Sequence, residues 1–325
     1  MMPEFSYIRP KTVDEAVRRL KEPGAMAHAG GTDLLGCLRE HIFDVKTVVS
    51  LSGLPGLRGV KEGADGGLMI GALTTLTEIA EKPAIRERFT ALSDAAGAAA
   101  SPQLRNQGTI GGNLGQKPRC WYYRGEFDCL RKGGNFCYAI NGENAFHCIF
   151  GGDNMCYIVH PSDPAPALAA LKAEARIIGP EGSRTMPVGE LHVRPASDPA
   201  RETWLEPGEF IVALQIPSPA KGTKSAYRKV RARRSWDFAL AGGAFVLTMD
   251  GDTVKDARVV LSGVATVPWR SEPVEQAIIG KALTEETISA AAEAAVEGAE
   301  PLSQNGYKVP LLKGVVREEL EKMAG

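Results

Sequence analysis

The 325-residue chain lacks the features that would point to a membrane or to nucleic acid. No apolar run approaches the ~20 residues that a bilayer-spanning helix needs. Its 38 basic and 39 acidic residues give a net charge of −1, so no large basic surface is expected for nucleic acid. The N-terminal segment has no basic stretch followed by an apolar one, as a signal peptide would. We therefore expect no membrane partner, no nucleic-acid partner and a cytoplasmic location, with export bound to a signal-bearing partner as an open alternative.

Cysteine is also scarce, yet five of the six cysteines fall between positions 120 and 156, and only Cys37 stands apart. Disulfide frameworks are rare in the cytosol, where thiols stay reduced. A cysteine cluster in a cytosolic chain favours metal binding or redox chemistry. The cluster is therefore a candidate metal site.

Catalytic motifs are missing as well. The sequence shows no Ser-His-Asp arrangement, no paired carboxylates and no H-E-x-x-H motif, and its five histidines are scattered. We predict no catalytic residue of the chain's own.

Hydrophobic periodicity predicts a mixed α and β chain that is long enough for two or three domains. A helix is expected over residues 12–20, because Thr12 and Glu15 have the spacing of a capping box. The region 75–100 reads as helices with a break at Pro83. Buried strands are expected over residues 45–54, 67–72 and 209–217.

Three further segments have a distinct character. Residues 106–116 read as a glycine-rich turn region, and residues 117–160 read as a long loop without sustained periodicity. From about residue 221 the pattern changes to a β meander followed by helices. We place the last domain boundary near 218–221.

Two glycine stretches are candidate phosphate-binding turns. "AGGTDLL" (29–35) and "GTIGGNL" (108–114) offer backbone N–H groups without side-chain obstruction, and Thr32 adds a hydroxyl. Neither matches the G-x-G-x-x-G fingerprint of a Rossmann fold. Taken alone, each stretch is weak evidence for a binding site and is better explained as an ordinary tight turn.

Taken together, motifs along nearly the whole chain resemble one family. In order, the chain contains "AGGTDLL", "IGALTTLTEI", "LRNQGTIGGNL", "PSDPAPAL", "YRKVRARRSWDFALAGGAF" and "GVATVPWR". This combination resembles the FAD-binding subunit of the xanthine dehydrogenase and carbon monoxide dehydrogenase family of molybdenum hydroxylases. The resemblance implies an α+β chain, with a two-subdomain FAD-binding fold of the vanillyl-alcohol-oxidase type and a C-terminal α+β domain. It implies subdomain 1 at 1–57, subdomain 2 at 58–218 with an insert at 117–160, and a CO dehydrogenase flavoprotein-like domain at 221–325.

The resemblance also implies cofactor-binding residues. Asp163 would accept hydrogen bonds from sugar hydroxyls of FAD, and Lys229 would place a positive charge near its isoalloxazine ring. Thr109, Gly112 and Asn113 would contact the pyrophosphate and the ribityl chain. The pyrophosphate would be wrapped by Met26, Ala27, His28, Ala29, Gly30, Gly31, Thr32, Asp33 and Leu34.

The insert resembles a smaller group of this family, which includes the β subunit of 4-hydroxybenzoyl-CoA reductase and the FAD subunit of a periplasmic aldehyde oxidoreductase. In that group the insert holds a [4Fe–4S] cluster, which requires four thiolates. The implied ligands are Cys120, Cys129, Cys137 and Cys156, with Cys148 as the rival for the fourth place. A structural zinc site that uses His147 or His160 is an alternative, although paired C-x₂₋₄-C motifs are missing. A loop without metal is the third possibility.

The implied function is electron transfer. A molybdenum-containing large subunit and a small [2Fe–2S] subunit would exchange electrons with FAD on this chain. FAD would then serve an external acceptor, which the sequence does not distinguish among ferredoxin, NAD, quinone and oxygen. The alternatives are a stand-alone FAD oxidase and a non-enzymatic scaffold subunit whose loop is stabilised by a bound metal.

Overall fold

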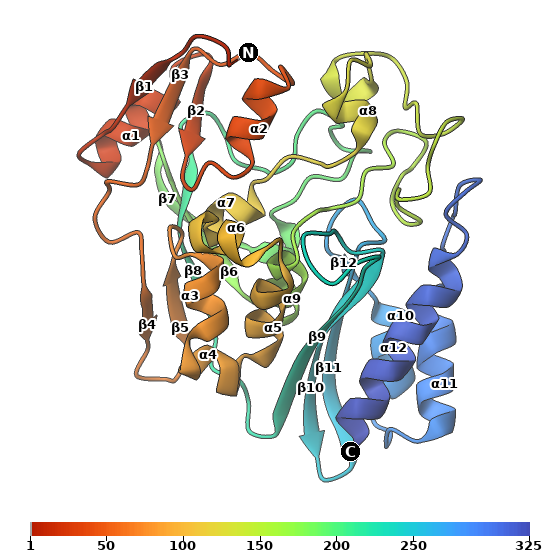
Figure 1. The fold of residues 1–325 in the computed structure, drawn as a ribbon. Coiled ribbons are helices and arrows are strands. Elements are labelled where there is room, and N and C mark those ends of the chain that lie inside the picture. The colour runs from red at the N-terminus through yellow and green to blue at the C-terminus, as the bar shows by residue number, and fades with distance from the viewer. Residues whose placement is uncertain (1) are drawn as a thin grey trace.

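A computed structural model describes residues 2–325 and shows a small parallel sheet at the N-terminal end of the molecule (Figure 1). Its strand order is β1-β3-β2. The predicted first helix is confirmed, because the Thr12 hydroxyl accepts a hydrogen bond from the Glu15 N–H at 3.2 Å. The elements of this part are β1 (Ser6–Ile8), α1 (Val13–Leu20), β2 (Ala25–His28), α2 (Leu34–Arg39) and β3 (Thr47–Ser50).

A second, five-stranded sheet is antiparallel, with strand order β4-β5-β8-β6-β7. The chain leaves this sheet after β5 and returns to it at β6, so about a hundred residues of helix and loop are inserted between these strands. The strands are β4 (Val60–Glu62), β5 (Leu68–Gly71), β6 (Glu174–Gly179), β7 (Gly182–Pro187) and β8 (Phe210–Ile216).

Helices cover one face of this sheet and bury a large apolar core against it. The break at Pro83 is confirmed, since this proline begins α4. The expected turn at 106–116 is wrong in part, because residues 110–114 form a short helix. Thr109 caps that helix by accepting from the Gly112 N–H at 3.2 Å. The helices are α3 (Leu76–Glu81), α4 (Pro83–Arg88), α5 (Thr90–Ala98), α6 (Pro102–Gln107), α7 (Ile110–Leu114), α9 (Pro164–Ala170) and the 3₁₀ helix η2 (Val188–Glu190).

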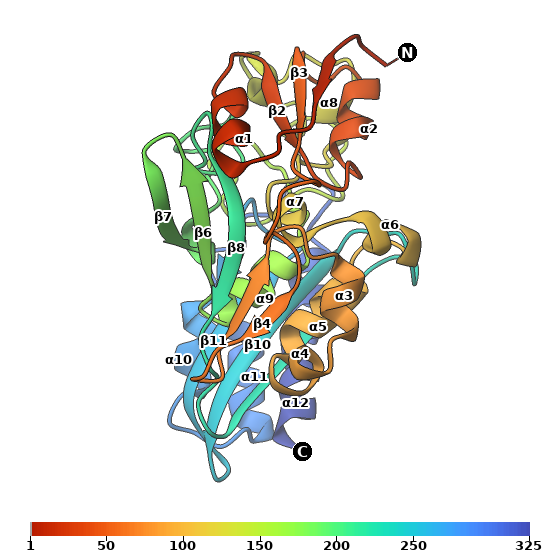
Figure 2. The ribbon, with the colours of Figure 1, turned by 90° about the vertical axis from the view of Figure 1, so that its left-hand side faces the viewer.

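The C-terminal part is a four-stranded antiparallel sheet with order β12-β11-β10-β9. Helices α5 and α9 pack on one face of this sheet, and α10 and α12 pack on the other, so the layers alternate along the molecule (Figure 2). The elements are β9 (Thr223–Val230), β10 (Ala241–Asp250), β11 (Thr253–Ser262), β12 (Trp269–Arg270), α10 (Glu272–Ile278), α11 (Glu285–Ala294) and α12 (Lys308–Ala324).

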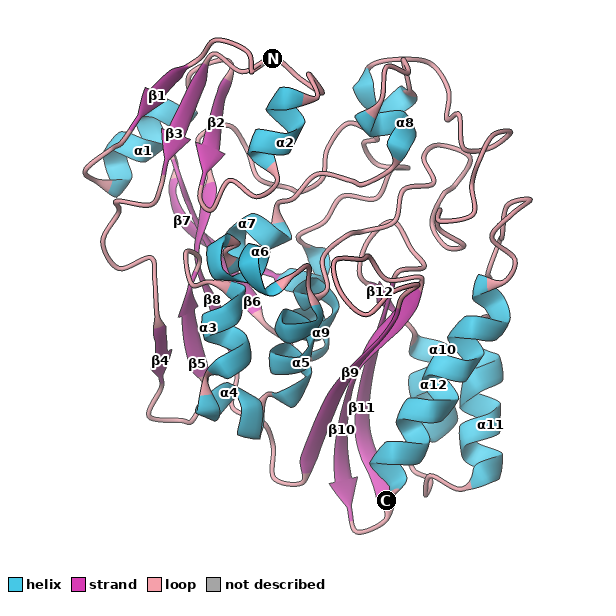
Figure 3. Ribbon diagram, viewed as in Figure 1, coloured by secondary structure: helices cyan, strands magenta, loops and turns pink. Residues whose placement is uncertain are grey.

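The segment 117–160, which we call the insert, is mostly loop, as its lack of periodicity predicts (Figure 3). Its regular structure is limited to α8 (Trp121–Arg124) and the 3₁₀ helix η1 (Leu130–Lys132). Near its end, Ile149 and Phe150 join the apolar core of the C-terminal part. The insert therefore reaches from subdomain 1 to the C-terminal sheet.

The mixed α and β fold expected from the sequence is confirmed. Among the elements of residues 2–325, no helix combines the length and the apolar character that crossing a bilayer requires.

Candidate functional site

The two glycine turns lie against each other. A Cβ atom on Gly30 would stand 2.0 Å from the carbonyl oxygen of Gln107, so any larger residue there would collide with the second turn. Gly31 has φ +72°, and a Cβ on it would meet the His28 ring at 2.6 Å. Both positions therefore require glycine, one for a close backbone approach and one for its backbone conformation.

The second turn is anchored to the rest of the subdomain. A Cβ on Gly111 would stand 2.9 Å from the Ala72 side chain, which is how α7 comes close to the end of β5. Asn113, at the end of α7, accepts a hydrogen bond from the Ser162 hydroxyl at 2.5 Å. The turn is thereby linked to the segment that carries Asp163.

Asp163 and Lys229 form a buried ion pair of 2.8 Å, with less than a tenth of either side chain exposed. The other carboxylate oxygen of Asp163 accepts from the Tyr227 hydroxyl at 2.8 Å. Burial and the Asp163 charge raise the pKa of Tyr227 well above its usual value, so the hydroxyl keeps its proton and donates. The structure thus brings together Thr109, Gly112, Asn113, Asp163 and Lys229.

A cavity of about 240 Å³ continues from this group and is called the central cavity below. One wall comes from the insert and the other from the C-terminal part, and the Arg119 guanidinium lies 5.2 Å from the centre of the Phe238 ring across it. Its lining includes Arg119, Cys120, Trp121, Phe146, His147, Ser162, Asp163, Phe238, Ser262 and Gly263. An apolar cavity with a few polar groups is typical of a small-molecule or cofactor site.

The stretch 26–34 divides into residues that face this region and residues that do not. Met26 and Leu34 pack against the small core of subdomain 1. The Asp33 carboxylate turns to the insert, pairing with Arg124 at 2.7 Å and with Arg119 at 2.9 Å. A ligand in the turn would accordingly meet residues 28–32.

His28, in this turn, has a ring nitrogen, Nδ1, that is shielded from water and makes no hydrogen bond. Burial is the main reason that the pKa of His28 is lowered. A buried polar atom without a partner is the kind of group that a bound ligand satisfies. Together with the glycine cradle, it fits the phosphates and sugar of a dinucleotide.

The four predicted metal ligands line a second, narrow cavity, called the cysteine cavity below. Cys120, Cys129, Cys137 and Cys156 all face it, and Arg131 and three tyrosines complete much of its wall. All six cysteines of the chain are free thiols. Cys148 is fully buried outside this cavity, where it packs against Tyr157 and other apolar groups.

The thiols of the cysteine cavity interact with one another. A hydrogen bond between Cys137 and Cys156 lowers the pKa of Cys137 and raises that of Cys156. Burial raises the pKa of Cys120 to about 11, and its sulfur lies 3.2 Å from His147 Nε2. Burial also lowers the pKa of His147 to about 4, so this imidazole is neutral.

The donor set does not form a closed metal site. Within residues 2–325, no three His, Cys, Asp or Glu side chains stand close enough to hold one metal ion together. The arrangement therefore supports neither a zinc site nor, by itself, an iron–sulfur cluster. The four cysteines share only the lining of one cavity.

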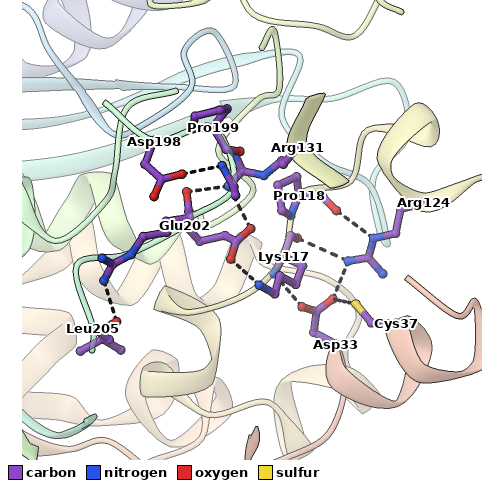
Figure 4. A network of polar contacts seen from close by, with 12 residues as sticks. Asp33, Cys37, Lys117, Pro118, Arg124, Arg131, Asp198, Pro199, Glu202 and Leu205 are labelled. Atoms are coloured by element: carbon purple, nitrogen blue, oxygen red, sulfur yellow. Dashed lines mark hydrogen bonds and ion pairs between the residues drawn. The ribbon is translucent and has the colours of Figure 1, made fainter. Parts of the chain in front are cut away.

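An ion network ties the start of the insert to Asp33, just before α2, and to Glu202, in the loop before β8 (Figure 4). Glu202 pairs with Arg131 at 2.9 Å and also with Lys117. The Lys117 N–H donates to Asp33 at 2.7 Å, which connects this pair to the Asp33 network. The network places Cys120 and Cys129 on a segment that is fixed at two points.

The sequence did not point to several residues of the site. Phe238, Ser262 and Gly263 line the central cavity, and Tyr227 donates to Asp163 beside it. Tyr227, Phe238 and Gly263 fall within the motifs of the resemblance, but nothing in those motifs marked them as site residues. Ser162 had a signal, because it immediately precedes Asp163 in "PSD".

Comparisons with known proteins agree with this geometry. Residues 3–219 match the family model described as the FAD binding domain in molybdopterin dehydrogenase. Residues 225–322 match the model described as the CO dehydrogenase flavoprotein C-terminal domain.

Individual relatives cover nearly the whole chain. The aldehyde oxidoreductase FAD-binding subunit of Escherichia coli (strain K12) is 37% identical over 317 residues, which are 96% of each chain. The carbon monoxide dehydrogenase medium chain of Hydrogenophaga pseudoflava is 31% identical and covers 92% of this chain and 88% of its own. A solved structure of carbon monoxide dehydrogenase from the same organism has a TM-score of 0.77 at 29% identity, covering 98% of this chain and 96% of that one.

The family model matches more than half of the chain, and the resemblance read from six motifs is confirmed. The chain therefore belongs to the FAD-binding medium subunits of the xanthine dehydrogenase and carbon monoxide dehydrogenase family, and it is an oxidoreductase subunit.

Proposed function

We propose that this chain is the electron-transfer flavoprotein subunit of a molybdenum hydroxylase complex and holds both FAD and a [4Fe–4S] cluster. One observation carries the proposal: the central cavity and the cysteine cavity share a wall, since Cys120 and His147 line both. Two redox groups placed on either side of that wall would be neighbours.

The pyrophosphate of FAD would lie between the two glycine turns. The residues that would hold it are His28, Ala29, Gly30, Gly31 and Thr32 from the first turn, with Thr109 and Gly112 from the second. Gly112 supports this pairing, because a Cβ on it would stand 3.9 Å from Ala29. Met26, Ala27, Asp33 and Leu34 would support the turn without touching the cofactor through their side chains.

The flavin end would lie in the central cavity. Bound FAD supplies two-electron redox chemistry. Asn113 and Asp163 would hold the ribityl and sugar hydroxyls, and Lys229 would hold the Asp163 carboxylate in position through their 2.8 Å contact. Arg119 and Phe238 would close the cavity from its two walls and exclude water.

Cys120, Cys129, Cys137 and Cys156 would bind the cluster, and Cys148 would not. The placement of Cys148 outside the cysteine cavity supports this choice. Thiolates are the ligands that iron–sulfur clusters require, and the lowered pKa of Cys137 favours its thiolate form.

The remaining parts of the proposal concern organisation. A molybdenum-containing large subunit and a [2Fe–2S] small subunit would be partners, because the relatives are named as medium chains and FAD-binding subunits. Ferredoxin, NAD, quinone or oxygen would take the electrons. The domain division at 57/58 and 218/221 is part of the same proposal, and each part contains one of the three sheets.

The visible spectrum of the purified chain, with and without dithionite, tests the proposal. Flavin bands above a broad iron–sulfur shoulder are expected, and both should bleach on reduction. Flavin bands alone would favour the oxidase alternative, and a colourless protein would favour the scaffold.

Two pairs of variants assign the residues. Cys137→Ser should remove iron, while Cys148→Ser should leave the iron content unchanged; the reverse result would contradict the ligand assignment. Gly30→Ala should lower FAD occupancy, and Gly31→Val should do the same. Gly36→Ala is the matched control, because the nearest atom to a Cβ at Gly36 is 4.0 Å away.

A further inference from the structure

Lys308, the first residue of α12, is a lysine with no exposed surface. Its Nζ atom donates to the carbonyl oxygen of Gly263 at 2.6 Å and to that of Phe146 at 3.4 Å. Both acceptors are neutral backbone groups, and within residues 2–325 Lys308 forms no ion pair. Its charge is therefore solvated by carbonyl dipoles and compensated by no carboxylate.

The partners of Lys308 belong to the two walls of the central cavity. Phe146 lines the cavity from the insert, and Gly263 lines it from the turn after β11. Lys308 thus places its ammonium group directly behind this lining and holds the two walls together. A buried charge without a counter-ion is destabilising, so a lysine at this place suggests a function.

Lys229 differs from Lys308 in this respect. It stands 2.8 Å from Asp163, and both side chains are buried, so the pair is neutral as a unit. A negative charge that develops in the central cavity would meet little net field from this pair. Arg119, which lines the cavity, shares the Asp33 carboxylate with Arg124, whereas Lys308 has no carboxylate partner within residues 2–325.

We propose that Lys308 is a positioning residue that stabilises the reduced, anionic form of the flavin in the central cavity; this rests on the proposed function. Reduction adds two electrons from the reductant and one proton from solvent, which leaves a net negative charge on the ring. Coulomb interactions weaken slowly with distance in a low-dielectric interior, so an ammonium behind the wall favours the reduced form over the oxidised one.

The protonation state of Lys308 sets a pH limit on this effect. Burial lowers its pKa to about 8. The titratable groups that face it are Cys148 and His147 of the insert, and the His147 imidazole is neutral near pH 7. The ammonium is thus charged at pH 7 and loses its charge as the pH rises above about 8.

The test compares three variants of the full chain. Lys308→Gln removes the charge and keeps a donor for a carbonyl, Lys308→Arg keeps the charge, and Lys313→Gln is the control on the same helix. Lys313 pairs with Glu293 on the surface, remote from the cavity lining. The affinities for oxidised and reduced FAD and the flavin midpoint potential would be measured by spectroelectrochemistry.

Lys308→Gln should keep its affinity for oxidised FAD within about threefold. The ratio of its affinities for reduced and oxidised FAD should fall about tenfold. For a two-electron couple this lowers the flavin midpoint potential by ~30 mV. Lys308→Arg and Lys313→Gln should match the wild type. An unchanged midpoint potential in Lys308→Gln would overturn the proposed role of Lys308 and leave it a purely structural one. Failure of the wild type to bind FAD would instead overturn the proposed function.

A measurement on the wild type keeps the proposal testable if Lys308→Gln does not fold. The midpoint potential should fall more steeply with pH above about pH 8, where Lys308 takes up a proton on reduction. A single slope from pH 6 to pH 10 would refute the role of this charge.

Discussion

The two walls of the central cavity are built by different means. The C-terminal wall belongs to a sheet and three helices that share a continuous apolar core. Phe245, at the centre of that core, is fully buried, and so are Leu312 and Val316 from the facing helix. This wall owes its shape to packing that needs neither metal nor cofactor.

The insert wall has little packing of this kind. Its buried residues are largely tyrosines and cysteines in two small groups, and several of its aromatic rings, including those of Trp121 and Phe146, are exposed. The contacts that fix the insert include ion pairs at its start, hydrogen bonds from Asn305 and Lys308 to its backbone, and the packing of Phe150 near its end.

The two walls should therefore differ in how strongly their stability depends on a bound ligand. A wall held by an apolar core tolerates the loss of a ligand, while a wall held by charges and thiols depends on each of them. We expect the C-terminal wall to give the chain its stability and the insert wall to respond to iron, acid and the breaking of single ion pairs.

Phe245→Ala should weaken the C-terminal wall most. Truncating a buried phenylalanine leaves a cavity and costs about 3–5 kcal/mol of unfolding free energy. Urea unfolding followed by circular dichroism measures this loss, which should be equal in protein with and without iron. Ile279→Ala, at an exposed site of the same part, should change stability little. A loss for Phe245→Ala that appears only without iron would remove the proposed distinction between the walls.

Local signals in the sequence predicted much of the fold. Thr12 and Pro83 act on neighbours a few residues away, so their helix cap and helix break were readable and are confirmed. The motif resemblance found the family because its glycine turns and "PSD" segment are short and contiguous. The helix at 110–114 was missed because Gly111 and Gly112 suggest a turn, while the Thr109 cap and the contact with Ala72 favour a helix.

Contacts between distant segments were beyond the sequence. Asp33 lies inside a glycine turn motif, yet its carboxylate pairs with Arg119 and Arg124, which are more than eighty residues away. Lys308 belongs to none of the motifs, and nothing near it in the sequence reveals the carbonyls of Phe146 and Gly263. Tertiary placement determines what such charged groups do.

Glu202→Gln should loosen the insert. It leaves Lys117 and Arg131 without their shared carboxylate, and Arg131 is almost fully buried. Breaking a fully buried pair costs about 3–5 kcal/mol, and partial exposure of Glu202 and Lys117 reduces our expectation to about 2–3 kcal/mol. Limited proteolysis should then cut within the insert earlier than within the C-terminal part. Glu206→Gln, which breaks the exposed pair with Arg201, is the control. Equal protection in both variants would contradict the role of the network.

Acid should act on the FAD-binding part and spare the C-terminal part, because none of the five histidines lies in residues 221–325. Burial lowers the pKa of His192 from 6.5 to about 4. The unfolded chain therefore binds more protons between these values, and stability falls as the pH falls from about 6.5 towards 4. The loss between pH 7 and pH 5 should be up to about 2 kcal/mol from this residue.

Comparison of variants at the two pH values isolates this contribution. His192→Gln keeps a donor for the Leu114 carbonyl, which His192 Nε2 contacts at 3.0 Å, and removes the titration. Its unfolding free energy should change less between pH 7 and pH 5 than that of the wild type. His41→Gln, at an exposed site, should retain the wild-type dependence. Identical pH profiles for His192→Gln and the wild type would exclude His192 as a source of acid sensitivity.

The smallest effect is expected from an ion pair in the C-terminal part. Lys313 and Glu293 join α12 to α11 at 2.5 Å, a distance as favourable as those in the Glu202 network, but about two-thirds of the Glu293 side chain is exposed. Water and salt screen such a pair, so Lys313→Gln should cost less than about 1 kcal/mol in urea unfolding. A cost as large as that of Glu202→Gln would mean that charge pairing stabilises both walls alike. A small cost would show that ion pairs stabilise the insert more strongly because burial there excludes the water that screens the Lys313–Glu293 pair.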